Sequence, residues 1–141
     1  MLHRFIIAFA VIASLAPARH AAAQDQGYPL VPLFSTGKTI VGEAIRYPTA
    51  GPANVTAAIV TVAVGAKTIM HEHGVPLFAY ILDGELTVDY GSHGKRVYRQ
   101  GEAFMEAMAV PHFGSNTGTQ PVRILAVYMG AQGAQDTIAT K

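Results

Sequence analysis

The stretch HEHGVPLFAYILDG, residues 71–84, decides the fold of this chain. Its second half is an apolar run that ends at Asp83-Gly84, a pair typical of two-residue hairpin turns. The run ELTVDY follows at once. The sequence therefore predicts two antiparallel strands, over 77–82 and 85–90, joined as a hairpin through this turn.

Four further segments are rich in β-branched and apolar residues and are bounded by glycine or proline: TIVGEAIRYP (39–48), VTAAIVTVAV (55–64), KRVYR (95–99) and PVRILAVYM (121–129). No segment after residue 23 shows a helical period with caps. Many short strands at close spacing predict an all-β sandwich or barrel. We expect a lead-in segment over 24–37, one barrel over 38–130 and a C-terminal tail over 131–141.

The composition limits the class of protein. The chain has 141 residues, enough for one domain, and it is half apolar and only 13% charged, so it should fold. A net charge of +1 without a Lys/Arg cluster predicts no nucleic-acid partner. There is no cysteine, so stability must come from burial, helped by any metal that binds.

Residues 1–23 have the pattern of a cleavable signal peptide. A basic start, the apolar run FIIAFAVIASLA and a final AAA are typical of one. The run is too short for a membrane span, which needs roughly 20 residues, although an uncleaved anchor or a buried helix is the alternative. Cutting after Ala23 removes Arg4 and Arg19, so eight of the 10 basic residues remain against 9 acidic ones, a net charge of −1. We expect a periplasmic or secreted protein that is not attached to a membrane.

Four histidines follow the leader, and two of them form a His-x-His pair. On a strand, His71 and His73 point to the same face with Cβ atoms roughly 6–7 Å apart, so both rings can reach one ion. The alternative is a pair of half-buried polar residues. His93 lies in the turn GSHG and is expected to be solvated.

The spacing of glycines and histidines resembles the cupin superfamily, whose motifs read G-x5-H-x-H-x3/4-E-x6-G and G-x5-P-x-G-x2-H-x3-N. The matching residues are Gly65, His71, His73 and Gly84 in the first motif, and Gly101, His112 and Asn116 in the second. The resemblance covers 38–130 and extends to small exported bacterial cupins without an assigned function. It implies a single antiparallel jelly-roll barrel that holds one divalent transition metal with three histidines. It also makes Asn116 a structural residue that bonds a backbone group.

One position departs from the first motif. Leu77 stands where cupins carry the glutamate that is usually the fourth ligand. Glu72 should point to the opposite face, so Glu106 is the candidate replacement, as a metal ligand or as a base on a metal-bound water. Its neighbours are apolar, and a buried carboxylate there needs a partner; the alternative is an outward, solvated Glu106. Ala107 and Ala109 stand where proline and glycine are usual.

The resemblance also assigns the two faces of the 77–82 strand. Leu77, Ala79 and Ile81 should line the cavity, because the motif glutamate does so in cupins. Phe78 and Tyr80 should then face outward, where they need cover from another sheet or a partner chain. We therefore expect a homodimer.

The chemistry leaves two classes of function open. Three imidazoles with open positions suit Fe, Mn, Zn, Ni, Co or Cu. One class is a metal-dependent oxidoreductase, such as a dioxygenase, that acts on a small organic substrate with Glu106 as the catalytic base. The other is a non-catalytic cupin that binds a metal or a small ligand.

Overall fold

The computed structural model describes residues 27–141, so the expected signal peptide over 1–23 lies outside the described residues. Residues from Pro32 to Lys141 form one compact unit, and every strand of the described part lies in it. These residues form no α-helix. In this part of the chain no helix has the length and apolar character that a membrane span requires.

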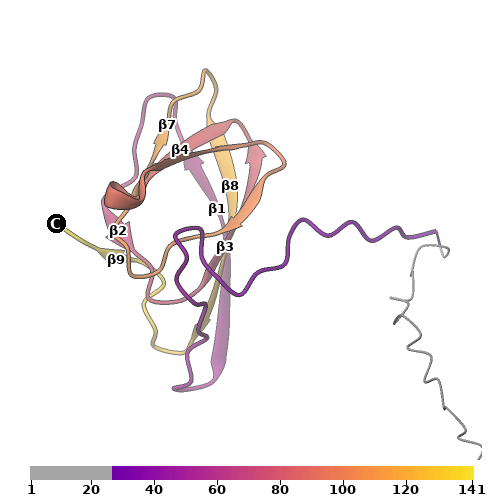
Figure 1. The fold of residues 1–141 in the computed structure, drawn as a ribbon, viewed down its shortest axis with the longest axis vertical. Helices are drawn as coiled ribbons and strands as arrows, with labels where there is room; N and C mark the ends of the chain where they lie inside the picture. Colours follow the sequence, from indigo (N-terminus) through magenta and orange to yellow (C-terminus); the bar gives the residue numbers. More distant parts are fainter. Residues whose placement is uncertain (1–26) are drawn as a thin grey trace, which may run out of the picture. The chain divides into compact units, whose positions relative to one another are not determined.

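Within residues 27–141, nine strands form three antiparallel sheets (Figure 1). The strands are β1 Ala53–Val62, β2 His71–Glu72, β3 Leu77–Asp83, β4 Glu85–Asp89, β5 Lys95–Arg99, β6 Ala103–Met105, β7 Phe113–Asn116, β8 Val122–Ala131 and β9 Ile138–Ala139. One sheet has the order β1-β8-β3-β6, the second β5-β4-β7, and β2 pairs with β9. The 3-10 turn Gly91–His93 joins β4 to β5.

The core lies between the two larger sheets. Alternation along β3 buries Leu77, Ala79 and Ile81, as expected. On the facing sheet, β4 buries Leu86 and Val88, which pack in the same hydrophobic core as Ala79 and Ile81. Strands therefore bury one face each, and the all-β, jelly-roll prediction is confirmed. The strands predicted over 55–64, 95–99 and 121–129 are present as β1, β5 and β8.

The hairpin predicted through Asp83-Gly84 is wrong. β3 pairs with β6 and β8, whereas β4 pairs with β5 and β7, so the two strands belong to different sheets. Gly84 has φ +81°, and a Cβ there would lie 2.9 Å from the carbonyl oxygen of Pro121. The glycine is needed because the chain turns a corner between sheets against β8, rather than reversing within one sheet.

The strand predicted over 39–48 is also wrong. Only an isolated bridge between Lys38 and Ala44 forms there. The Thr39 hydroxyl accepts the backbone N–H of Glu43 at 3.1 Å and donates to the Glu43 carboxylate at 2.9 Å. These local bonds offer the backbone an alternative to a sheet ladder, and the segment becomes a tight turn.

The outer face of the larger sheet carries the aromatic residues expected there. Phe78 and Tyr80 are half-buried. Phe34 from the lead-in segment stacks on Phe78 with ring centroids 5.8 Å apart. The lead-in segment of the same chain therefore shields part of this aromatic face from solvent.

Candidate metal centre

Two short strands bring three histidines together. His71 begins β2, and His112 immediately precedes β7. The two residues form an antiparallel bridge in which each backbone N–H donates to the other carbonyl, at 3.0 and 2.9 Å. Directly opposite residues point to the same face, and His73 joins them because it is two positions from His71 on that face.

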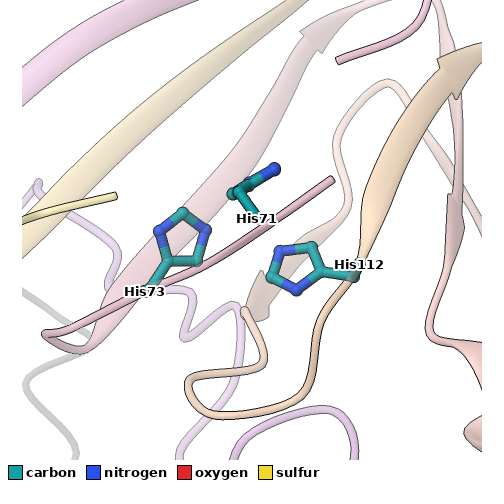
Figure 2. A group of neighbouring side chains, drawn as sticks. All are labelled: His71, His73 and His112. Carbon is teal, nitrogen blue, oxygen red and sulfur yellow. The ribbon is translucent and has the colours of Figure 1, made fainter. Parts of the chain in front are cut away.

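The three rings face a common point (Figure 2). One ring nitrogen from each of His71, His73 and His112 lies within 4.8 Å of the others. Ring centroids are 4.5–5.2 Å apart. Two nitrogens that each lie about 2.0–2.1 Å from one ion are at most about 4.2 Å apart, so the rings need to approach one another by no more than about 0.6 Å to share an ion.

Hydrogen bonds to backbone carbonyls fix the tautomer of all three rings. Nδ1 of His71 donates to Ile69 at 2.8 Å, that of His112 to Val110 at 2.8 Å, and that of His73 to Asp136 at 3.0 Å. A carbonyl can only accept, so Nδ1 carries the proton and Nε2 keeps its lone pair. Nε2 of His112 is buried without any hydrogen-bond partner. The residues fit a metal, because such an ion would be the partner that this buried nitrogen lacks.

Burial keeps the three imidazoles neutral. It lowers the pKa of His71 and His112, and it lowers the pKa of His73 to about 4. A metal binds the neutral ring, so protons compete little with it at pH 7.

The three histidines line a small cavity between the two larger sheets. The cavity has a volume of about 80 Å³, and its other walls include Leu77, Ala79, Phe104 and Ala126. None of the described residues that line it is Lys or Arg. A bound metal would therefore be the main positive charge in an apolar space.

Comparison with known protein families agrees with the fold and the histidine motif. A model described as "Cupin domain" matches residues 58–128, half of the chain. The chain belongs to the cupin family. No curated protein matches it.

Solved structures share the fold of this cupin. An oxalate decarboxylase from Lactobacillus farciminis, in a formate complex, is 21% identical with a TM-score of 0.53, over 60% of this chain and 26% of the decarboxylase. The polyketide cyclase RemF from Streptomyces resistomycificus is 19% identical with a TM-score of 0.53, over 71% of this chain and 69% of the cyclase. The protein BH2720 from Bacillus halodurans is 19% identical with a TM-score of 0.51, over 60% of this chain and 69% of its own. At these identities the likeness concerns the fold alone, and this cupin spans only about a quarter of the decarboxylase.

Glu106 lies directly opposite Leu77, the residue at the cupin glutamate position. Phe78 pairs with Met105 in the β3–β6 ladder, and the Glu106 N–H continues it by donating to the Leu77 carbonyl at 2.9 Å. Opposite residues share a face, and both side chains line the cavity. The structure thus places a carboxylate in the same cavity from the neighbouring strand.

The carboxylate of Glu106 is buried and lies beside His112. Its Oε2 is 3.8 Å from Nε2 of His112, and its Oε1 accepts the N–H of Ala107 at 2.8 Å. Burial raises the pKa of Glu106 to about 7, against the opposing effect of hydrogen bonds from Tyr90 and from the Ala107 N–H. A carboxyl with this pKa can accept or release a proton near neutral pH.

Sequence reasoning missed two tyrosines behind this carboxylate. Tyr90 and Tyr98 are buried, and their hydroxyls are 3.0 Å apart. Tyr98 stacks on Phe104 with centroids 3.6 Å apart. Strand alternation could have placed both residues inward, but no spacing in the sequence links them to Glu106.

Sequence reasoning also missed Glu43, which holds the loop that leads to His112. Its two carboxylate oxygens accept the backbone N–H groups of Met108 and Ala109, each at 2.8 Å. Ala109 lies where the second cupin motif usually has glycine, and Met108 lies between the motif's proline and glycine positions. A carboxylate from the turn at 39–43 shapes the loop instead.

The remaining predicted residues lie as expected. Asn116 is buried, and its Nδ2 donates to the carbonyls of Val62 and Gln120, each at 2.9 Å. It is structural, as the motif implies. His93 is exposed in the 3-10 turn, outside the histidine cluster.

Proposed function

We propose that this cupin binds one divalent transition metal through His71, His73 and His112. We further propose that it oxidises a small organic molecule there, as a dioxygenase or a related oxidoreductase. The observation that carries this proposal is the convergence of three neutral imidazoles, among which the buried Nε2 of His112 has no hydrogen-bond partner. Fe, Mn, Zn, Ni, Co and Cu all accept such a donor set. Three protein ligands leave open positions, as catalytic sites do and closed structural zinc sites do not.

Glu106 is the proposed fourth ligand or catalytic base. When bound, the metal supplies a Lewis acid and positions for substrate and dioxygen. Oε2 of the carboxylate lies 3.8 Å from His112 Nε2, so Glu106 would place a proton acceptor beside any ion that the histidines hold. The Ala107 N–H holds Oε1 and leaves Oε2 directed to the histidines.

The cavity limits the class of substrate. A volume of about 80 Å³ is well below the roughly 300–1,000 Å³ of sites for drug-sized ligands. The walls are apolar and carry no cationic side chain among the described residues. We therefore propose a substrate of a few heavy atoms, with one anionic oxygen for the metal and an apolar remainder.

An exchange of side chains across the β3–β6 ladder tests the role of Glu106. The metal content and oxygen uptake of the native protein are compared with those of Glu106→Leu and of the double variant Leu77→Glu/Glu106→Leu. Glu106→Leu should lower metal occupancy, and the double variant should restore it, because the carboxylate returns to the same cavity from the opposite residue. If native protein binds no stoichiometric metal, the proposed function is wrong. If it binds metal and Glu106→Leu is unchanged, Glu106 has no part in the site.

A non-catalytic cupin that holds a metal or small ligand is the second candidate. The small cavity favours it, since little space is left beside an ion. Oxygen uptake with small phenols and other small organic acids distinguishes the two. Turnover that follows metal content supports the enzyme, whereas full metal occupancy without turnover of any of these compounds supports the binding protein.

We also propose export and dimerisation. Cleavage after Ala23 would give a mature periplasmic or secreted chain that begins at Gln24, which intact-mass analysis of the exported protein would detect. Val55 and Ile59 are exposed on β1, which is an edge strand of the larger sheet. A second copy that covers this edge and the neighbouring outer face with Phe78 would give a homodimer.

A further inference from the structure

The C-terminal segment 132–141, which we name the C-terminal strap, returns to β2, which begins with His71 and ends directly before His73. β9 pairs with β2 so that Ala139 lies opposite His71. The N–H of Thr140 donates to the Met70 carbonyl at 3.1 Å. Figure 1 shows β2 and β9 side by side near the C-terminus. A segment that was expected only as a C-terminal tail thus lies against the site.

The strap supplies the hydrogen bond that fixes the ring of His73. Nδ1 of His73 is 3.0 Å from the Asp136 carbonyl and 3.5 Å from the Thr137 hydroxyl. His71 and His112 each use a carbonyl only two residues away along the chain. His73 uses one that is 63 residues away. Its tautomer therefore depends on whether the strap is in place.

The strap also fits closely around this part of the chain. A Cβ at Gly74 would lie 2.5 Å from the carbonyl oxygen of Gln135, a distance that real Cβ atoms essentially never show. A Cβ at Gly130 would lie 3.4 Å from a carboxylate oxygen of Asp136. Any side chain at position 74 must displace the strap backbone.

We propose that the C-terminal strap is a positioning element of the metal centre, in which the Asp136 carbonyl holds His73 with Nε2 free for the metal. The inference rests on the proposed metal site. Loss of such an outer hydrogen bond typically weakens metal binding 10- to 100-fold. Because coupling between two equilibria is reciprocal, bound metal must stabilise the closed strap by the same factor. β9 contributes only two paired residues, so this stabilisation should be measurable.

The experiment uses Zn²⁺ or Co²⁺ titration of the metal-free protein in three forms. These are the native chain, Gly74→Ala, which pushes the strap away, and a chain that ends at Ala134. Gly37→Ala is the matched control, because nothing lies within 4 Å of a Cβ there. We expect 10- to 100-fold weaker binding in the two strap variants and no change in the control.

Two spectroscopic measurements separate positioning from a general loss of structure. In imidazole ¹⁵N NMR of the metal-free native chain, His73 should show the Nδ1–H tautomer, and in the strap variants a mixture of tautomers. Hydrogen exchange at the Thr140 amide of the native chain should slow when Zn²⁺ is added, by a factor that matches the coupling. If the shortened chain does not fold, Gly74→Ala and the exchange measurement decide.

The outcomes distinguish this inference from the proposed function. If the native chain binds no metal, the proposed function is wrong and this inference with it. If the native chain binds metal, and the strap variants bind it as tightly with an unchanged His73 tautomer, the strap has no positioning role while the metal site stands.

Discussion

The substitution Glu43→Gln tests how the loop before His112 is held. Both oxygens of the Glu43 carboxylate are in use: Oε1 accepts the Ala109 N–H, and Oε2 accepts the Met108 N–H, each at 2.8 Å. A glutamine has the same shape but only one acceptor oxygen. Its NH₂ group would face the second N–H, so one of these bonds must be lost.

The size of the effect follows from these contacts. A hydrogen bond to a charged group contributes about 1.5–3 kcal/mol, and loss of the negative charge also weakens the bond that stays. The exposed position of Ala109 lets water reach part of this site, so we expect the lower end, about 2 kcal/mol. For a domain of this size that loss lowers Tm by roughly 8 °C. Because the loop ends at His112, metal affinity should also fall about 10-fold.

Urea unfolding of the metal-free protein and a separate metal titration measure the two effects. Glu85→Gln is the control, since that carboxylate pairs with Arg99 at the surface at 3.0 Å and should contribute at most about 1 kcal/mol. The reasoning is refuted if Glu43→Gln unfolds within about 0.5 kcal/mol of the control and binds metal as tightly as the native chain.

Three further predictions concern the metal, the pH dependence and assembly. Saturating metal at about 100 times Kd should stabilise the native protein by about 2.7 kcal/mol, and His112→Ala should abolish this increment in calorimetric scans with and without metal. The pKa of His73 is about 4 in the folded protein and about 6.5 in the unfolded chain. Between pH 4 and pH 6.5 the unfolded chain therefore binds a proton at His73 that the folded protein does not bind. The metal-free protein should therefore lose about 3 kcal/mol as pH falls from 6.5 to 4, relative to His73→Gln; equal pH profiles for the two proteins would contradict this. Val55→Lys should shift the sedimentation of the proposed dimer towards monomer at tens of micromolar, whereas Lys95→Glu, remote from that edge, should not.

The sequence predicted what depends on local periodicity. Period-two alternation separated the two faces of β3, and the resemblance to cupins correctly put Leu77 inward and Phe78 outward. The same rule placed His71 and His73 on one face. The spacing of the second motif identified His112, which the structure brings opposite His71.

Features that depend on long-range pairing could not be predicted in this way. The Asp83-Gly84 pair indicates a turn, but turn chemistry does not say which strand receives the chain, and here it leads into the other sheet. Glu43 reaches a loop 65 residues away, and the Asp136 carbonyl acts through the backbone, which no residue type reveals. The sequence names Glu106 as the candidate replacement for the glutamate missing at Leu77, but only the strand register shows that the two residues lie opposite each other.

The distance along the chain between His73 and His112 affects how much more tightly a metal ion binds the folded chain than the unfolded chain. In the unfolded chain, one ion could use both rings only by closing a loop of about 40 residues, at an entropic cost of about 4 kcal/mol. Folding has already closed this loop, because β2 and the residue before β7 lie side by side. At about 1.4 kcal/mol for each factor of ten, the ion should prefer the folded chain roughly a thousandfold through loop closure alone. For a chain without cysteine, this preference would give a reversible cross-link whose strength follows the free metal concentration.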